Sequence, residues 1–353
     1  MKKAYLVLED GQVFEGLRFG AETDALGELV FTTGMCSYLE TLTDPSYAGQ
    51  IVMQTFPLIG NYGLIPADFE GESHLRGYVV REVCDSPSNF RSEGTLDTYL
   101  KARGIPGLCG VDTRALTRLV REKGVMNACI CAQVPASLHA IQSYRVRGAV
   151  AEVSGGGLCR YAPEGQPRHR VALLDYGMKR GILRALLARG CEVLRFPADS
   201  SAEAVLAEAP DGLVLSNGPG DPAENLFQIE QLRKLLGRLP LFGICLGHQL
   251  TALAAGGSTY KLKFGHRGAN QPVRELGGQR TYITSQNHGY AVQAGVPDGR
   301  VSFVNANDGS CEGIDYPGLR AFTVQFHPEA CAGPRDTAFL FDRFLALMEG
   351  GAF

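Results

Sequence analysis

The sequence predicts an α/β protein with two domains, of which the C-terminal one is built on a mainly parallel sheet. From residue 171 to residue 255, short apolar runs alternate with helix-like segments, which indicates parallel strands with helices on both faces. Residues 153–167 are rich in glycine and proline and lack sustained periodicity, as connections between domains do. A length of 353 residues with 45% apolar residues is sufficient for two hydrophobic cores.

We assign residues 1–150 to a smaller N-terminal domain, 151–168 to a linker and 169–353 to the C-terminal domain. The N-terminal part has short β-branched runs between segments rich in glycine and proline. We therefore expect an α+β or β-rich unit there.

One helix of the N-terminal domain is well marked, over residues 114–123. Asp112 can cap its start and Gly124 can end it, and the apolar stripe that it would bury consists of Leu116, Leu119 and Val120.

In the C-terminal domain, apolar periodicity predicts an alternation of strands and helices. The first helix has one apolar face, which begins at Ile182, and Gly190 can terminate it. The predicted strands are residues 171–175, 192–196, 212–216 and 239–244, and a further helix is predicted over residues 247–255.

Cys245 falls on a sharp turn between the strand at 239–244 and the helix that follows. Such a turn is expected to expose the sulfur and to direct the positive end of a helix dipole at it, which favours the thiolate that acts as a nucleophile. A single cysteine is more often a small buried hydrophobe. However, Gly243 and Gly247 on either side permit a crowded backbone that a core cysteine does not need.

His327 and Glu329 follow another apolar run far downstream and complete a hydrolase-like set. His327 is the candidate base, and Glu329 is the group that would orient it. Alone, each has an ordinary interpretation, as a structural histidine and an exposed loop charge. Only their combination with Cys245 favours catalysis.

A glycine-rich loop, residues 217–222, follows the strand at 212–216. At the C-terminal end of a strand in an α/β sheet, its backbone N–H groups could point toward a developing oxyanion. Asn-Gly and Gly-Asp are also ordinary turn formers, so the loop alone is weak evidence.

These segments resemble the signatures of class I, triad-type glutamine amidotransferases in order and spacing. The matching segments are residues 215–222 (LSNGPGDP), 242–249 (FGICLGHQ) and 325–329 (QFHPE). The resemblance implies that Cys245 attacks the side-chain amide of L-glutamine, forms a γ-glutamyl thioester and releases ammonia, after which water frees glutamate.

The N-terminal half resembles the small subunits of carbamoyl-phosphate synthetase, so that the likeness covers essentially the whole chain. It rests on residues 5–11 (YLVLEDG), 27–32 (GELVFT), 42–47 (LTDPSY), 60–63 (GNYG) and 110–118 (GVDTRALTR).

The two resemblances imply a set of glutamine-contacting residues. The N–H groups of Gly218 and Leu246 would form the oxyanion hole, and Ser46 would reach the substrate from the N-terminal domain. The remaining positions are Gly220, Gln249, Asn287, Gly289 and Tyr290.

Two places depart from the family pattern. Residues 33–38 read TGMCSY where a Thr-Gly-Tyr sequence is more common, and Tyr290 stands where phenylalanine is common. Neither change removes a catalytic group. The sequence does not predict whether the extra hydroxyl of Tyr290 raises or lowers the affinity for glutamine. The Cys36-Ser37 change is expected to alter only packing or subunit contact.

Composition indicates a cytoplasmic enzyme. The ten cysteines form no Cys-x-x-Cys pair, which favours a reducing compartment. No apolar stretch approaches a membrane-spanning length, and the N-terminal apolar run stops at Glu9, too soon for a signal peptide. The net charge of −3 gives no electrostatic case for nucleic acid or for an anionic membrane.

No metal site is expected, because nothing near His248 or His266 has chelating spacing, and surface or supporting roles suit both better. The chain also lacks a phosphate-binding loop and has no room for ATP-using modules. We therefore expect no cofactor in this chain and a large partner subunit that receives the ammonia. By the resemblance, ATP, magnesium and potassium belong to that partner.

Two other functions stay open at this point. An amidotransferase subunit for anthranilate or aminodeoxychorismate synthesis would carry similar motifs, although such subunits generally lack a separate N-terminal domain. A degenerate regulatory or scaffold homologue is the non-enzymatic alternative, and the complete set of Cys245, His327 and Glu329 argues against it. The sequence does not distinguish arginine from pyrimidine synthesis, name the effectors or set the number of heterodimers.

Overall fold

The computed structural model describes residues 2–330 and 333–351, and the chain divides into two compact units between Arg147 and Gly148. The strands of the first unit are β1 Lys2–Leu8, β2 Val13–Gly20, β3 Ala25–Thr32, β4 Gln50–Gln54, β5 Leu58–Ile59, β6 Gly77–Val79, β7 Glu82–Val83, β8 Pro106–Cys109 and β9 Met126–Cys131. Its helices are α1 Tyr38–Thr43, α2 Leu96–Ala102, α3 Thr113–Lys123 and α4 His139–Ser143, with 3-10 turns at Pro45–Tyr47 and Pro66–Asp68.

The first unit is a closed β-barrel with the strand order β1-β2-β8-β6-β4-β3-β9. The β3-β4, β4-β6 and β6-β8 pairs are parallel, and the others are antiparallel. The barrel closes because β9 pairs with both β1 and β3. The expectation of an α+β or β-rich unit is thus met by a mixed barrel with short helices.

Helix α3 confirms the prediction made for residues 114–123. The Asp112 carboxylate accepts a hydrogen bond from the N–H of Ala115 at 3.0 Å. Gly124 ends the helix with a φ of 97°, a conformation that glycine adopts without strain. Of the predicted apolar stripe, Leu116 and Val120 are buried as expected, whereas Leu119 is only partly buried.

The second unit contains the strands β10 Cys159–Tyr161, β11 His169–Asp175, β12 Cys191–Pro197, β13 Gly212–Leu215, β14 Leu241–Ile244, β15 Thr259–Glu275, β16 Thr281–Val292, β17 Arg300–Asn305, β18 Cys311–Tyr316 and β19 Ala321–Val324. Its helices are α5 Ala149–Val153, α6 Arg180–Leu187, α7 Ala202–Ala207, α8 Leu226–Leu235, α9 Leu246–Ala254 and α10 Phe339–Met348, with 3-10 turns at Pro222–Glu224 and Pro317–Leu319.

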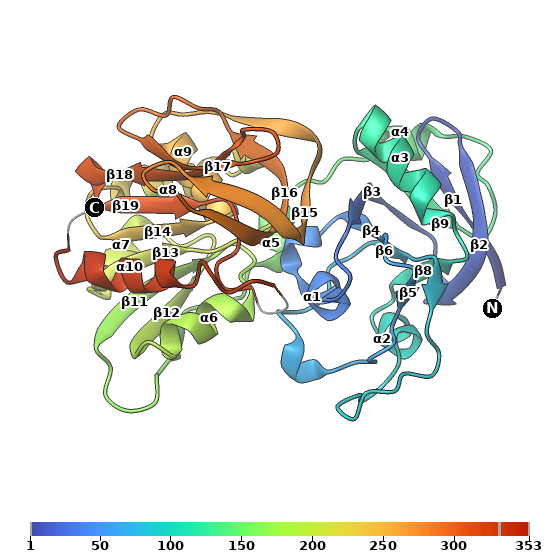
Figure 1. Cartoon of the computed structure of the whole chain (residues 1–353), viewed down its shortest axis with the longest axis horizontal. Helices are drawn as coiled ribbons and strands as arrows, with labels where there is room; N and C mark the ends of the chain where they lie inside the picture. Colours follow the sequence, from blue (N-terminus) through green and yellow to red (C-terminus); the bar gives the residue numbers. More distant parts are fainter. Residues whose placement is uncertain (1, 331–332, 352–353) are drawn as a thin grey trace. The chain divides into compact units, whose positions relative to one another are not determined.

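These strands form one sheet in the order β10-β12-β11-β13-β14-β19-β18-β16-β15-β17. From β12 to β19 the pairs are parallel, and the strands on both sides of this block are antiparallel. Helices α7, α8 and α9 pack on one face, and α6 and α10 pack on the other (Figure 1). This arrangement confirms the predicted α/β domain with a mainly parallel sheet.

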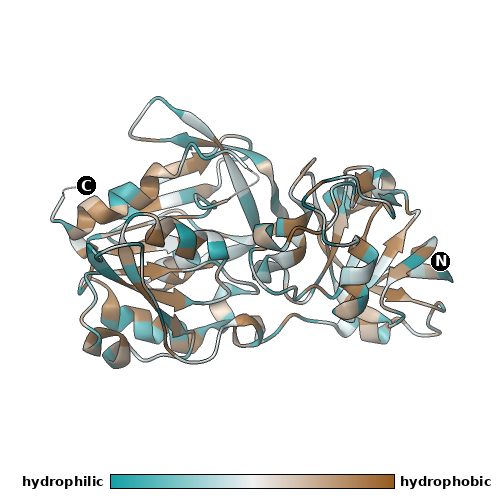
Figure 2. Ribbon diagram, turned by 90° about the horizontal axis from the view of Figure 1, so that it is seen from below, coloured by the Kyte–Doolittle hydropathy of each residue, from teal (hydrophilic) through white to brown (hydrophobic). Residues whose placement is uncertain are grey.

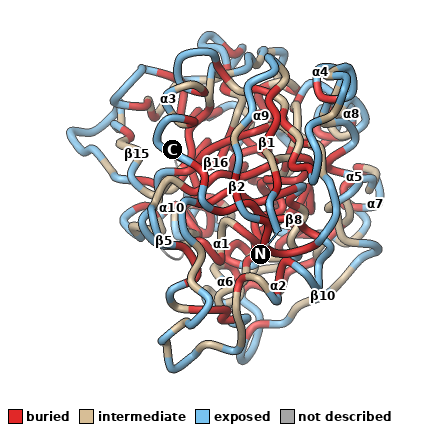
Figure 3. Tube along the Cα trace, turned by 90° about the vertical axis from the view of Figure 1, so that its right-hand side faces the viewer, coloured by how far each residue is buried: buried red, intermediate tan, exposed pale blue. Residues whose placement is uncertain are grey.

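The layers follow from the apolar pattern of the strands. In Figure 2, hydrophobic segments run along the strands, and in Figure 3 the buried trace is concentrated in the strands, whereas loops are exposed. On one face of the sheet, Phe242 stacks on Phe322 and meets Phe341 of α10 edge-on. Strands that are buried on both faces consist of nearly continuous apolar residues, so short apolar runs in the sequence were sufficient to locate these strands.

Residues 151–168, predicted as a linker, contain regular structure and lie in the second unit. Strand β10 pairs antiparallel with β12. The Ser154 hydroxyl also accepts a hydrogen bond from the N–H of Ala198, and the Asp175 carboxylate accepts one from the N–H of Gly155. Glycine-rich composition indicated an extended connection, but it did not reveal that this segment adds an edge strand to the sheet.

Candidate active site

Cys245 occupies the turn between β14 and α9, as predicted, with a φ of 54° and a ψ of −103°. A positive φ is strained for a non-glycine residue and requires support from its surroundings. Part of this support is the hydrogen bond from the Cys245 N–H to the Val324 carbonyl at 2.8 Å. The sulfur is not exposed as the sequence suggested: the side chain is buried, and Sγ lies 3.7 Å from the Asn287 carbonyl oxygen.

The glycines around Cys245 allow the chain to pass close to neighbouring backbone. A Cβ at Gly247 would lie 2.5 Å from the Leu215 carbonyl oxygen, and one at Gly243 would lie 2.8 Å from the Thr323 side chain. Real Cβ atoms do not approach their neighbours so closely. Both glycines are therefore required by the geometry of the turn, in agreement with the sequence interpretation.

His327 and Glu329 form a buried pair in the loop after β19. The imidazole Nδ1 donates to the Glu329 carboxylate Oε1 at 2.7 Å, and neither side chain is exposed to solvent. Because Nδ1 carries the proton in this bond, Nε2 is the atom left for chemistry. Nε2 is buried and makes no hydrogen bond of standard geometry with any residue of 2–330 or 333–351.

Cys245 nevertheless lies close enough to His327 to act on its charge. Burial and the Lys179 ammonium act to lower the pKa of His327, but the negative charges of Glu329 and of Cys245 outweigh them and raise it to about 9. The Cys245 sulfur and the His327 imidazole are thus electrostatically coupled. Catalytic hydrogen bonds often tighten only when substrate binds.

Lys179 is a site residue that the sequence interpretation missed. Its Nζ lies 3.9 Å from Glu329 Oε1, and its side chain is only 9% exposed. Burial acts to raise the pKa of Glu329, but the charges of His327 and Lys179 prevail and lower it. Lys179 follows β11 at the carboxyl edge of the sheet, where α/β proteins place their active sites. Its position just after a predicted strand could therefore have identified it as a candidate site residue.

The loop after β13 lies directly beside the Cys245 turn. The Gly247 N–H donates to the Ser216 carbonyl at 3.1 Å, and a Cβ at Gly218 would lie 2.7 Å from a methyl carbon of Leu246. Inside the loop, the Asn217 side chain accepts from the Lys179 N–H at 2.9 Å. Gly218 and Leu246, the two predicted oxyanion donors, are therefore neighbours in the structure.

Strand β16 brings the segment 287–290 to the same place. Besides the contact of Asn287 with Cys245, the Gln249 side-chain NH₂ donates to the Tyr290 carbonyl at 2.8 Å and to the Gln325 side-chain oxygen at 2.9 Å. The second unit thus assembles around Cys245 most of the residues that the sequence suggested for glutamine.

Ser46 lies in the first unit, in the turn Pro45–Tyr47, where the Asp44 carboxylate accepts from its N–H at 2.9 Å. Its contact with glutamine stays a prediction. In the neighbouring segment that departs from the family pattern, Ser37 has a φ of 73°, and Tyr38 stacks on Tyr62 with ring centroids 4.1 Å apart. Cys36 is exposed.

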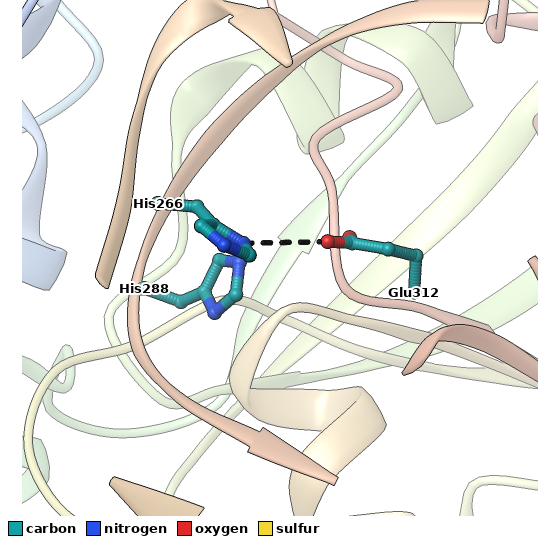
Figure 4. Close-up of side chains that lie close together, drawn as sticks. All are labelled: His266, His288 and Glu312. Atoms are coloured by element: carbon teal, nitrogen blue, oxygen red, sulfur yellow. Dashed lines mark ion pairs between the residues drawn. The ribbon is translucent and has the colours of Figure 1, made fainter. Parts of the chain in front are cut away.

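The two histidines considered in the sequence lie inside the unit rather than on its surface. His248 is buried on α9 beside the Thr323 hydroxyl at 2.8 Å, and burial lowers its pKa to about 3. His266 lies in a cluster with His288 and Glu312 (Figure 4). Helix α9 and strand β15 turn both side chains inward, which their spacing did not reveal.

Two family models match the sequence. The model of the carbamoyl-phosphate synthase small chain, CPSase domain, covers residues 6–130, and that of class-I glutamine amidotransferases covers residues 172–347. The carbamoyl phosphate synthase small chain of Bacillus caldolyticus is 50% identical over 354 residues, which are 98% of this chain and 96% of that protein. The chain belongs to the carbamoyl phosphate synthase small-chain family.

The corresponding small chain of Symbiobacterium thermophilum is 50% identical over 360 residues, 98% of each protein. A solved structure of a glutamine amidotransferase from Thermotoga maritima covers 52% of this chain and 85% of its own, with 17% identity and a TM-score of 0.40. The family assignment confirms the resemblance of both halves. This member of the family thus carries a class I amidotransferase domain, as a glutaminase subunit does.

No helix in the part of the chain that the structure describes is long and apolar enough to cross a bilayer.

Proposed function

We propose that this chain hydrolyses L-glutamine through a γ-glutamyl thioester on Cys245. The observation that carries the proposal is the strained turn that places Cys245 at the start of α9, coupled to the buried His327–Glu329 pair. A non-glycine residue with a positive φ at such a position is typical of nucleophile turns.

In the first half-reaction, the Cys245 thiolate attacks the side-chain carbonyl carbon of glutamine. The carbonyl oxygen becomes an oxyanion, which the N–H groups of Gly218 and Leu246 would stabilise. The raised pKa of His327 keeps its imidazole protonated at neutral pH, so Nε2 has a proton to give. That proton goes to the leaving nitrogen, the C–N bond breaks, and ammonia and the thioester result.

In the second half-reaction, the now neutral His327 accepts a proton from water, whose oxygen attacks the thioester carbon. Collapse of the intermediate breaks the C–S bond and releases glutamate, the thiolate and a protonated imidazole. The Glu329 carboxylate keeps its hydrogen bond to Nδ1 throughout, which fixes the ring and stabilises its positive charge.

The remaining candidates would hold the substrate rather than react with it. They belong to the loop after β13, to α9 and to β16, and the contacts of Asn287 with Cys245 and of Gln249 with Tyr290 support this role; Ser46 would add a hydroxyl from the first unit. These residues are Gly220, Gln249, Asn287, Gly289, Tyr290 and Ser46.

We further propose that the ammonia passes to a large subunit that makes carbamoyl phosphate from bicarbonate. The small chain itself would use no cofactor, and ATP, magnesium and potassium would belong to the large subunit. The nine cysteines within the described residues are free, which supports a reducing compartment and hence the cytoplasm.

The test is carbamoyl phosphate synthesis by the complex of this chain with its large subunit, with glutamine or with ammonium as the nitrogen source. We expect synthesis with both and release of glutamate only with glutamine. Synthesis from ammonium alone would favour a degenerate homologue. Glutamine hydrolysis without any carbamoyl phosphate would favour an amidotransferase subunit of another synthetase.

A further inference from the structure

A continuous set of buried hydrogen bonds lies behind the segment 287–290. It starts at Glu312 of β18, whose Oε2 accepts from the side-chain NH₂ of Gln286 at 3.0 Å. The Gln286 side-chain oxygen lies 3.0 Å from Nε2 of His288, and His288 Nδ1 lies 2.7 Å from the Tyr290 carbonyl oxygen. All three side chains are at most 5% exposed.

The Tyr290 carbonyl connects this set to the helix that carries the nucleophile. It also accepts from the Gln249 NH₂, which donates its second hydrogen to the Gln325 side-chain oxygen. The Gln325 N–H in turn donates to the Glu312 carbonyl at 2.9 Å. The hydrogen bonds therefore close into a ring, made of Glu312, Gln286, His288, Tyr290, Gln249 and Gln325.

The Tyr290 end of the ring fixes the direction of its hydrogen bonds. A backbone carbonyl can only accept, so Gln249 must turn its NH₂ toward Tyr290. The second hydrogen of that NH₂ requires an acceptor, which the Gln325 oxygen supplies. The Gln249 oxygen has no partner within residues 2–330 and 333–351. Gln249 lies one helical turn after Cys245, and its N–H donates to the Cys245 carbonyl at 3.2 Å.

We propose that Glu312 and Gln325 are positioning residues, which act through this ring to hold Gln249 with its side-chain oxygen free to accept from glutamine. The proposal rests on the proposed function. The side chains of Glu312 and Gln325 bond to other polar groups of the sheet and of α9, rather than to the nucleophile or the base, so their effect is on binding geometry. It follows that their loss raises the KM for glutamine more than it lowers kcat.

The close approach of His266, His288 and Glu312 does not require a metal ion. His266 lies between the Asp308 carboxylate at 2.9 Å and the Glu312 carboxylate at 3.4 Å, and Glu312 also accepts from Asn305 at 3.0 Å (Figure 4). Each donor atom of the cluster thus already has a protein partner, which a buried polar network needs for stability.

The ring can be satisfied with a single proton shared between Glu312 and His288. With Glu312 ionised, Gln286 donates to it, and His288 must carry a second proton to meet the Gln286 oxygen. Burial raises the pKa of Glu312, and burial with the charge of His266 lowers that of His288. A proton on Glu312 and a turned Gln286 amide satisfy the contacts with Glu312 and His288 without charge, although the turned amide gives up the hydrogen bond that its NH₂ donates to the Thr284 hydroxyl at 3.2 Å. A glutamine at position 312 offers the same donor and acceptor as that neutral acid.

Because glutamine can replace a protonated Glu312, variants at position 312 test the proposal in the complex with the large subunit. We expect Glu312→Leu and Gln325→Leu each to raise the KM for glutamine about tenfold, with kcat changed by less than about threefold. Glu312→Gln should stay within about twofold of the wild type. Synthesis from ammonium should be unchanged in all three variants, which also shows that they fold and assemble.

Cys311→Ala is the matched control, because Cys311 is the buried neighbour of Glu312 on β18 and points to the opposite face. It should leave the KM for glutamine unchanged. Wild-type KM values in both leucine variants, or equal losses in Glu312→Gln and Glu312→Leu, would overturn the inference. A wild-type complex that hydrolyses no glutamine would instead overturn the proposed function.

Discussion

At the scale of single residues, Cys245 combines a positive φ, burial and a place at the first turn of α9. Replacement by serine changes little volume, so we expect Cys245→Ser to fold but to lose nearly all glutamine-dependent synthesis, because a hydroxyl is far less ionised than a thiol. Synthesis from ammonium should persist. Cys191→Ser, at a buried cysteine of β12, is the control and should keep both activities. Normal glutamine use by Cys245→Ser would remove Cys245 from the mechanism.

His327 and Glu329 should differ in the size of their effects. His327→Asn removes the group that moves protons, whereas Glu329→Ala leaves an imidazole that is only less well oriented, so the loss of kcat should be larger for His327→Asn. Steady-state glutaminase kinetics of the two complexes give the ranking. Equal and complete inactivation of folded variants would show that Glu329 does more than orient the ring.

The pKa of His327 also predicts how stability depends on pH. Because the folded-state pKa of about 9 exceeds the ordinary value of 6.5, this histidine stabilises the fold fully below about pH 6.5, and its contribution is lost as pH rises through about 9. The free energy of unfolding should fall by at least about 1 kcal/mol more in the wild type than in His327→Asn between pH 6.5 and 9.5. Parallel pH profiles from denaturant unfolding of the two proteins would contradict this assignment.

At the scale of secondary-structure elements, the turn between β14 and α9 depends on its glycines. Alanine normally favours a helix over glycine, yet at Gly247 its Cβ would meet the Leu215 carbonyl oxygen. We expect Gly247→Ala to destabilise the fold by about 1–3 kcal/mol and to lower kcat for glutamine. Gly318→Ala, where a Cβ would meet no atom within 4 Å, should be neutral in both thermal unfolding and activity. A stabilised and active Gly247→Ala would mean that the turn has room for a methyl group.

The sequence was sufficient to predict the elements that depend on local pattern. The strand before Cys245, the helix after it and the caps of α3 all follow from apolar periodicity and glycine placement. The pairing of distant strands does not, so the closed barrel and the strand added by residues 159–161 were not predicted. Lys179 and Glu312 were missed because a single charged residue carries no periodic signal, and only folding brings them to Glu329 and Gln286.

At the scale of the whole molecule, the two units are expected to cooperate in binding glutamine. If the Ser46 hydroxyl of the first unit bonds to substrate held by the second, Ser46→Ala should raise the KM for glutamine roughly fivefold, about 1 kcal/mol, with little change in kcat. Titration of glutamine and of ammonium against the same complex checks this. Equal losses with both nitrogen sources would indicate a defect of folding or assembly, and no loss would leave Ser46 as a turn residue.

The closure of the barrel has a consequence for how the chain folds during synthesis. Strand β9 pairs with β1, where Tyr5 faces Cys131, and also with β3. Until β9 has emerged from the ribosome, β1 and β3 each present an open edge with unpaired backbone groups. Such long-range pairing slows folding. While it is being synthesised, the first unit therefore exposes the unpaired edges of β1 and β3. In a fragment that ends before Met126 these edges stay unpaired, which favours aggregation.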